Sequence, residues 1–425
     1  MRLSIWIAIL VWLLSLVAAL YTGRDLLYNT FYLITLSIIG SWLWTRQNIR
    51  GLEIHRRVRT PRSQVGKYVE ESFEVINLGW LSKLWVEVRD ESDLPGHKAS
   101  RVLVALKPKR PHYWTVRTPC IQRGRYRLGP VSLRSGDPLG IFEATKRVPG
   151  EHSVLVYPPT YDIPGFQLPP GRMPGGKIAR FRTHYLTTNV ASVRDYAPGD
   201  SFNRIHWPST ARTGRLIVKE FELDPTSDVW ILLDLDEAGH VAQPWDIPDM
   251  TKLLTSSHHS HRKQEPALAP ATIEYAAAAA ASIARRYLAE RRAVGLITYA
   301  PRRQMLQLER GHRQFTKILE TLAVINPTQS LSLDRILTAE GHFMDRNATV
   351  VVITPSTDNA WVEALREYRR RGVNATVVLV AASTFGPVPS YRPILAELWA
   401  SQIPVYVLRR GESISTALSH MAPPE

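Results

Sequence analysis

Two long uncharged apolar stretches near the start of the chain constrain its fold most. Residues 4–20 read SIWIAILVWLLSLVAAL and residues 26–44 read LLYNTFYLITLSIIGSWLW. Each is close to the roughly 20 residues that cross a bilayer as a helix. A cleaved signal peptide is the alternative for the first stretch, since Arg2 precedes it and Ala19 stands near its end. Because a second apolar stretch follows so soon, we expect two transmembrane helices, a hairpin, within residues 1–45.

The charges beside the two apolar stretches indicate their orientation. Only Arg24 and Asp25 lie between them, whereas a dense set of arginines follows the second stretch. These arginines are Arg46, Arg50, Arg56, Arg57, Arg59 and Arg62. Lys and Arg near the end of a span are retained on the cytoplasmic side, and such a cluster suits contact with anionic headgroups. We therefore expect a multi-pass protein of a bacterial inner membrane with both termini in the cytoplasm.

Composition and net charge limit the kinds of partner and the kinds of metal or disulfide site that the chain can have. The chain has 425 residues, enough for two or three domains, and a formal net charge of +15. This sign favours anionic lipid, nucleic acid or an acidic protein face. The cations concentrate beside the span and form no stripe interleaved with aromatic residues, so we expect no nucleic acid partner. The single cysteine, Cys120, excludes an intramolecular disulfide and a Cys-rich zinc site.

Short alternating runs separated by Gly, Pro and Asn turns fill residues 46–164. They indicate strands at residues 68–77, 84–89, 101–106, 112–117 and 153–157. The glycine-rich segment 123–142 fits two further short strands with tight turns. A phosphate-binding loop is the alternative there, but no Gly-Lys-Ser/Thr ending and no helix follow. We expect a small antiparallel β-sandwich-like domain.

Strands and helices alternate across residues 228–425. The apolar runs predict strands at residues 229–236, 293–300, 349–354, 375–382 and 403–410. Between or after them, helices are expected at residues 273–292, 313–324, 360–371, 393–400 and 413–421. Continuous apolar strands indicate a sheet covered on both faces, hence a doubly wound α/β domain. Ligands of such sheets bind beyond the carboxyl ends of the strands, here at residues 234–237.

Residues 165–227 form a linker that contains the densest polar segment, 193–222. Asp200 and His206 could act as an acid–base pair, with Ser201 or Ser209 as nucleophile. The alternative is a charge-paired clasp between the two domains with Trp207 as its apolar plug. No Gly-x-Ser-x-Gly elbow is present, and the clasp is the interpretation that we prefer.

The same segment carries a family resemblance. Its Arg-x-Tyr-x-x-Gly-Asp-x-x-x-x-Ile-x-Trp-x-x-x-Ala-Arg pattern resembles the hallmark of the domain of unknown function 58 family (DUF58). The residues of this pattern are Arg194, Tyr196, Gly199, Asp200, Ile205, Trp207, Ala211 and Arg212. The two leading spans and the run that reads GDPLGIF are also similar to that family. The resemblance implies a von Willebrand A-like (Rossmann-type) domain, membrane attachment and association with MoxR-type AAA+ ATPases.

A von Willebrand A metal site would present Asp-x-Ser-x-Ser after the first strand of the α/β domain. Here Asp234 is present, but Asp236 and Ala238 replace the two serines. The later loop carries Thr354 where an Asp would be expected. Asp234 and Asp236 could still bind Mg²⁺ or Ca²⁺, which take oxygen ligands, or could be solvated loop acids.

Residues 237–271 lack periodicity and are expected to form a flexible insertion. They hold His258, His259 and His261, which lack the helical i,i+4 spacing of zinc enzymes. We recognise no complete set of catalytic residues in the sequence, so we do not expect an enzyme. The sequence instead indicates a membrane-anchored interaction or scaffold component that faces the cytoplasm and works with a AAA+ ATPase. The alternative is a metal-dependent ligand-binding or hydrolytic protein that uses Asp234 and Asp236.

Overall fold

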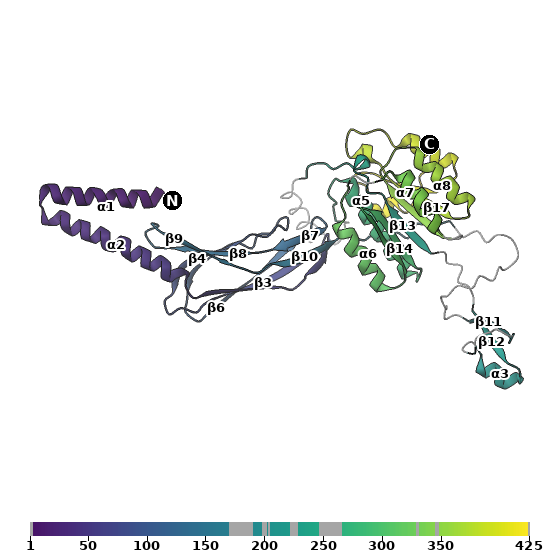
Figure 1. Ribbon diagram of the computed structural model, residues 1–425, viewed down its shortest axis with the longest axis horizontal. Coiled ribbons are helices and arrows are strands. Elements are labelled where there is room, and N and C mark those ends of the chain that lie inside the picture. The colour runs from purple at the N-terminus through teal and green to yellow at the C-terminus, as the bar shows by residue number, and fades with distance from the viewer. Residues whose placement is uncertain are drawn as a thin grey trace.

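The computed structural model shows an elongated molecule with a helical hairpin at one end and an α/β domain at the other (Figure 1). It describes residues 3–169, 190–197, 202, 205–221, 228–245, 266–328, 331–344 and 348–423.

The hairpin consists of α1 (Leu3–Thr22) and α2 (Asp25–Ile49). Gly23 joins them with a φ of +63°, a conformation that glycine adopts without a steric penalty. Trp12 Nε1 donates a hydrogen bond of 2.8 Å to Thr35 Oγ1 across the pair. Both helices are long and apolar enough to cross a membrane, and only 6% of each apolar window is buried inside the molecule. The expected pair of apolar helices is therefore present, although α2 runs beyond residue 45.

A β-domain follows α2 directly. Its strands are β1 (Leu52–Val58), β2 (Arg62–Gln64), β3 (Tyr68–Asn77), β4 (Lys83–Asp90), β5 (Arg101–Leu106), β6 (Pro111–Pro119), β7 (Gly124–Leu128), β8 (Val131–Gly136), β9 (Glu143–Val148) and β10 (His152–Tyr157). The expected strands are all present. β1, β2 and β9 were not anticipated, since polar and charged residues dominate them.

Two antiparallel sheets of this domain pack face to face. Their orders are β1-β3-β6 and β5-β4-β8-β9. Every second residue of β3 is buried, and Phe73 and Val75 of β3 share one core with Val86, Val88 and Leu133 of the other sheet. A third sheet, β2-β10-β7, continues the domain, and in it β2 pairs with β10 in parallel. The sandwich-like arrangement expected from the alternating pattern is thus observed with one parallel pair.

The β-domain ends at β10 and not at residue 164, so the expected boundary is corrected. Tyr161, Ile163 and Phe166 are buried in the core of the α/β domain. The Tyr161 N–H donates to Ser282 Oγ at 3.0 Å. These large apolar side chains lie in a proline-rich stretch that looks like a turn in sequence. The free energy gained by burying these side chains in the α/β core explains why the stretch packs there instead of forming an exposed turn.

The α/β domain has a six-stranded mixed sheet of order β15-β14-β13-β16-β17-β18. Its strands are β13 (Val229–Leu233), β14 (Val294–Tyr299), β15 (Arg303–Glu309), β16 (Thr349–Thr354), β17 (Asn374–Val380) and β18 (Val405–Leu408). Its helices are α5 (Thr272–Ala289), α6 (His312–Val324), α7 (Leu333–Glu340), α8 (Ala360–Arg370), α9 (Arg392–Ala400) and α10 (Ile414–Ala417). Residues of α5, α6 and α10 share one core, and residues of α7, α8 and α9 share the other. Helices therefore cover both faces of the sheet, as expected.

Four details of this domain correct the expectations. β15 is an antiparallel edge strand that was not anticipated, because its polar residues alternate as they would in a solvated loop. α7 was also missed, and α10 is shorter than the expected helix at 413–421. The flexible insertion expected at 237–271 is folded at both ends: Ala242 pairs with Ala271, and residues 237–239 form a short 3₁₀ helix. His258, His259 and His261 lie outside the described residues.

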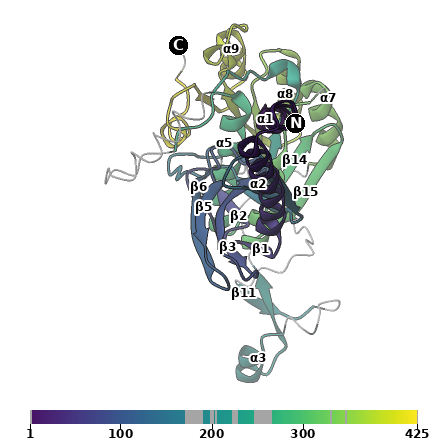
Figure 2. The same ribbon diagram turned by 90° about the vertical axis from the view of Figure 1, so that its left-hand side faces the viewer.

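The family segment forms a small unit of its own. It comprises β11 (Val190–Asp195), α3 (Trp207–Thr213) and β12 (Ile217–Phe221), with β11 antiparallel to β12. In both views this unit lies apart from the sheets of the two domains (Figures 1 and 2).

Candidate functional site

The family segment is held together by a few local contacts. Ile205 and Val218, which are 3% and 2% exposed, pair across its centre. The Ile217 N–H donates to Thr210 Oγ1 at 3.0 Å, which ties α3 to β12. Gly214 ends α3 in the left-handed conformation, with φ of 68°, and donates its N–H to Thr210 O. The unit is therefore a formed element with a minimal core.

Its large aromatic side chains point to solvent. Trp207 is 64% exposed and Phe202 is 70% exposed. The Phe202 ring stacks on Tyr196 with a centroid distance of 6.1 Å. Trp207 is thus not the buried plug that the sequence suggested, because Ile205 takes the inward position two residues earlier. Ala211 and Arg212 on α3 are exposed as well.

The structure brings together one of the pairs considered for catalysis. His206 Nδ1 lies 2.6 Å from Ser209 Oγ, and the Ser209 N–H donates to the His206 carbonyl. These contacts close the first turn of α3 and are local in sequence. Gly199, Asp200 and Ser201 lie outside the described residues, so the proposed acid–base partner is not placed. A structural role of His206 as the residue preceding α3 accounts for the geometry.

At the carboxyl ends of β13 and β16, Asp234 meets Thr354. Asp234 is 1% exposed, and its Oδ2 accepts a hydrogen bond of 2.6 Å from Thr354 Oγ1. Its Oδ1 accepts the Asp236 N–H at 3.0 Å. Burial raises the pKa of Asp234 to about 6, and the two hydrogen bonds oppose this rise only in part. The first expected site residue is therefore a buried carboxyl group that is hydrogen-bonded on both oxygens.

The Asp236 carboxylate accepts a hydrogen bond from the backbone of its own loop. Its Oδ1 accepts the Ala238 N–H at 3.4 Å and so begins the 3₁₀ helix at residues 237–239. His240, which the sequence assigned to a flexible loop, donates or accepts at both ring nitrogens: Nε2 lies 3.0 Å from the Asp234 carbonyl and Nδ1 lies 2.9 Å from Thr272 Oγ1. Burial lowers the pKa of His240 to about 4, so the ring is neutral at physiological pH.

These residues do not fit a metal cage. Asp234 uses both carboxylate oxygens, on Thr354 and on the Asp236 N–H, and Asp236 uses Oδ1 on the Ala238 N–H, whereas Mg²⁺ and Ca²⁺ require several oxygen ligands. Across the described part of the chain, no group of three or more His, Cys, Asp or Glu side chains could hold a metal ion. We therefore assign no ion to this edge of the sheet.

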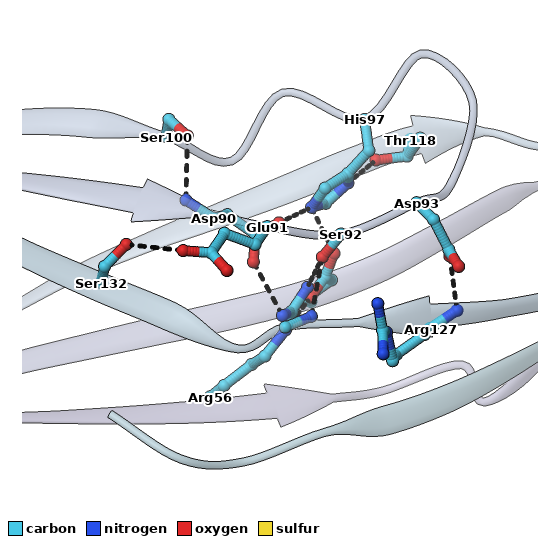
Figure 3. A network of polar contacts seen from close by, with 12 residues as sticks. Arg56, Asp90, Glu91, Ser92, Asp93, His97, Ser100, Thr118, Arg127 and Ser132 are labelled. Carbon is cyan, nitrogen blue, oxygen red and sulfur yellow. Dashed lines mark hydrogen bonds and ion pairs between the residues drawn. The ribbon is translucent and has the colours of Figure 1, made fainter. Parts of the chain in front are cut away.

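A buried ionic cluster in the β-domain was not anticipated (Figure 3). Arg56 Nε lies 2.6 Å from Glu71 Oε2, and Arg56 Nη1 lies 2.9 Å from Asp90 Oδ1. His97 Nε2 lies 2.9 Å from Asp90 Oδ2, and His97 Nδ1 lies 2.7 Å from Thr118 Oγ1. All four charged or imidazole side chains are at most 6% exposed, which leaves no access for a substrate. The cluster is therefore a structural core of paired charges.

Arg123 makes a buried contact between the two domains. Its side chain is 1% exposed and forms an ion pair with Glu274 at the start of α5. It also donates to the carbonyls of Leu322 and Ile325 at the end of α6, at 2.8 and 2.7 Å. A cation at the carboxyl end of a helix satisfies free carbonyls and interacts favourably with the helix dipole. Arg62 on β2 forms a further ion pair with Glu320 on α6 at 2.8 Å, at an exposed position. Asp200 and Arg204 lie outside the described residues, so the clasp predicted for the family segment stays a prediction.

An open pocket of about 730 Å³ lies beside the start of α10. Tyr161, Trp245, Tyr275 and Arg410 are among its lining residues, and Tyr275 Oη accepts the Gly411 N–H at 2.9 Å. Trp245 and Pro266 both line the pocket, and residues 246–265 between them lie outside the described part of the chain. We therefore assign no ligand to the pocket.

Comparison with known proteins identifies the family segment. Residues 192–242 match the family model described as "Protein of unknown function DUF58". YeaD of Bacillus subtilis (strain 168) is 32% identical to this chain over 115 residues, which are 27% of this chain and 29% of YeaD. The aligned part is therefore less than a third of that relative.

Solved structures give weaker likenesses. The CARDB domain of a Pyrococcus furiosus protein, in complex with di-metal ions, is 21% identical and covers 25% of this chain and 91% of that domain, with a TM-score of 0.20. Proximal thread matrix protein 1 of the mussel byssus is 9% identical and covers 45% of this chain and 46% of that one, with a TM-score of 0.29. Scores this low carry no functional argument.

Proposed function

Because this chain carries the DUF58 family region at residues 192–242, we propose that it is a membrane-anchored protein-interaction component. The helical hairpin holds it in the bacterial inner membrane with both termini in the cytoplasm. The family segment binds a protein partner, a MoxR-type AAA+ ATPase. The von Willebrand A-like domain serves as its scaffold.

The exposure of Trp207 and Phe202 is the observation that carries this proposal. Soluble surfaces rarely present two large aromatic side chains at 64% and 70% exposure on one small element. Trp and Tyr dominate the energetics of protein interfaces because one such side chain can bury a large area at a low entropic cost. The fold of the unit does not use these rings, since Ile205 and Val218 form its core.

Charge around the two rings indicates the kind of surface that binds them. Arg212 and Arg215 are exposed on the same unit. Exposed cations next to an aromatic anchor favour a partner with acidic side chains around an apolar pocket. This is the sign that the net charge of +15 also favours.

The metal-dependent alternative receives no support from the geometry. Asp234 is buried and bonded on both oxygens, and Asp236 is engaged with the backbone. A scaffold role of the α/β domain requires neither group to be free.

A photo-reactive amino acid in place of Trp207 tests the proposal in native membranes. Tyr113 is the matched control, since it is also an aromatic residue at 64% exposure but lies on β6 of the β-domain. We expect irradiation to link the ATPase to position 207 and not to position 113. Equal adducts at both positions, or an adduct at 207 that lacks the ATPase, would contradict the proposal.

A further inference from the structure

Three turns meet at the end of the β-domain from which α2 emerges. The strand register places two of these turns at this end. Leu52, the first residue of β1, pairs with Asn77, the last residue of β3, and Lys83, the first residue of β4, pairs with Leu106, the last residue of β5. The β8–β9 turn closes at the same end, where α2 contacts both strands. Figure 1 shows α2 joining the domain at this end. We call residues 78–82, 107–110 and 137–142 the rim.

The rim is fixed rigidly to the end of α2. Asn48, which is 4% exposed, donates from Nδ2 to Ser135 Oγ. The Lys83 ammonium, in a side chain only 1% exposed, donates to the Gln47 carbonyl at 2.7 Å. These buried contacts prevent the domain from swinging freely about the helix. Five residues of helix separate Trp44 from Ile49, a rise of about 8 Å, which is close to the thickness of one headgroup layer.

Large apolar side chains project from the rim. Trp80 is 75% exposed, Leu139 is 63% exposed and Leu78 is 52% exposed. Both turns that carry them are held in shape by polar side chains. The Asn77 amide donates to Leu81 O and accepts the Gly79 N–H. The exposed apolar side chains are therefore presented by ordered turns.

Asp137 holds the other turn and at the same time removes its charge from the surface. Its carboxylate accepts the N–H groups of Leu139 and Phe142, at 2.9 and 2.6 Å, and is part of a residue only 3% exposed. It is the only acidic residue in the rim. Apart from the buried Lys83, the cations of the rim and its helix junction are exposed: Arg50, Lys107, Lys109 and Arg110.

We propose that the rim is a second membrane-contact surface, which inserts Trp80 and Leu139 into the headgroup layer of an anionic bilayer while its cations bind lipid phosphates. Interfacial tryptophan and lysine or arginine side chains have this preference at membrane surfaces. The contact holds the β-domain against the bilayer, with its long axis away from the membrane. This inference rests on the proposed membrane anchor, since α2 sets the height of the rim.

Depth-dependent quenching tests the rim in the full chain. Single cysteines replace Trp80, Leu139 or Gln122, each labelled with a small fluorophore, and the protein is reconstituted into vesicles of phosphatidylcholine with phosphatidylglycerol. Gln122 is an exposed control beyond the far end of β6, about 30 Å from the rim. Cys120 is fully buried, and the parent chain gives the background of its labelling.

With headgroup-labelled quencher lipids, we expect quenching at positions 80 and 139 to exceed that at 122 by on the order of threefold. Lys107→Gln, Lys109→Gln and Arg110→Gln together should reduce that excess, as should pure phosphatidylcholine. A chain that floats with the vesicles yet shows equal quenching at all three positions would overturn the rim and leave the anchor intact. Lipid-independent self-quenching at 80 and 139 would instead assign the rim to a second copy. A chain that fails to float would refute the anchor and the rim together.

Discussion

At the scale of single residues, a small set of charged side chains is buried and paired inside the protein. Arg56 and Glu71 occupy core-facing positions of alternating strands, where apolar residues are the rule. A charged residue at a core-facing strand position can be recognised in the sequence, and it indicates that the residue has a buried polar partner. Which residues pair cannot be read from it, because Asp90 and His97 come from a different sheet and a loop. The same holds for Arg123, whose partner Glu274 is 151 positions away.

Asp234 makes a prediction about pH. Its pKa is about 6 in the folded protein against 3.8 for an ordinary aspartate, so the folded state binds the proton more tightly. The resulting stability is complete below about pH 3.8 and is lost as pH rises through 6, a difference of roughly 3 kcal/mol. Asp234→Asn should therefore melt progressively higher than the parent as pH increases from about 4.5 to 7.5. Asp358→Asn, at an exposed position, is the control, and a pH-independent difference for Asp234→Asn would refute the assignment.

Arg123 makes a prediction about the junction between the domains. Arg123→Met leaves Glu274 buried without its partner, a change that typically costs about 3–5 kcal/mol. We expect a clear drop in melting temperature, whereas Arg125→Met, at an exposed position on β7, should change it little. Adding Glu274→Gln to Arg123→Met should recover part of the loss. An Arg123→Met chain that melts like the parent would show that the pair does not stabilise the junction.

At the scale of elements, the sequence was informative where periodicity was strong. The strands at 68–77, 101–106 and 349–354 have the expected bounds because alternation or a continuous apolar run ends at a turn residue. β15 and α7 were missed because neighbouring elements determine which of their residues become buried. In the family segment, the direction of Trp207 depends on a core of two residues, Ile205 and Val218, that periodicity does not reveal.

The family segment makes a prediction that separates binding from folding. Trp207→Ala removes an exposed side chain, so the free energy of unfolding should change by an amount typical of surface sites, about 0.5 kcal/mol or less. Partner affinity should fall about tenfold or more if Trp207 is an interface anchor. Ile205→Ala, in the buried centre of the unit, should weaken binding by unfolding the segment, which limited proteolysis would detect. Trp207→Ala with parental affinity would exclude this ring from the interface.

At the scale of the whole molecule, the two exposed apolar helices lie at one end and the family segment lies away from them (Figure 1). α1 and α2 expose apolar surface along their lengths, while the family segment carries its aromatic residues on a separate unit. The chain should stay in the membrane fraction at high salt and alkaline pH, because two spans hold it by apolar burial and not by charge. Release under either condition would show peripheral attachment.

Co-flotation with the purified ATPase tests both ends at once. The full chain is reconstituted into vesicles, mixed with a MoxR-type AAA+ ATPase and floated on a density gradient. We predict that the ATPase rises with vesicles that contain the parent chain and stays at the bottom with vesicles that contain the Trp207→Ala chain, although both chains float. An ATPase that floats equally with both, or with neither, would contradict the account of this protein as a membrane-anchored interaction component that acts through its family segment.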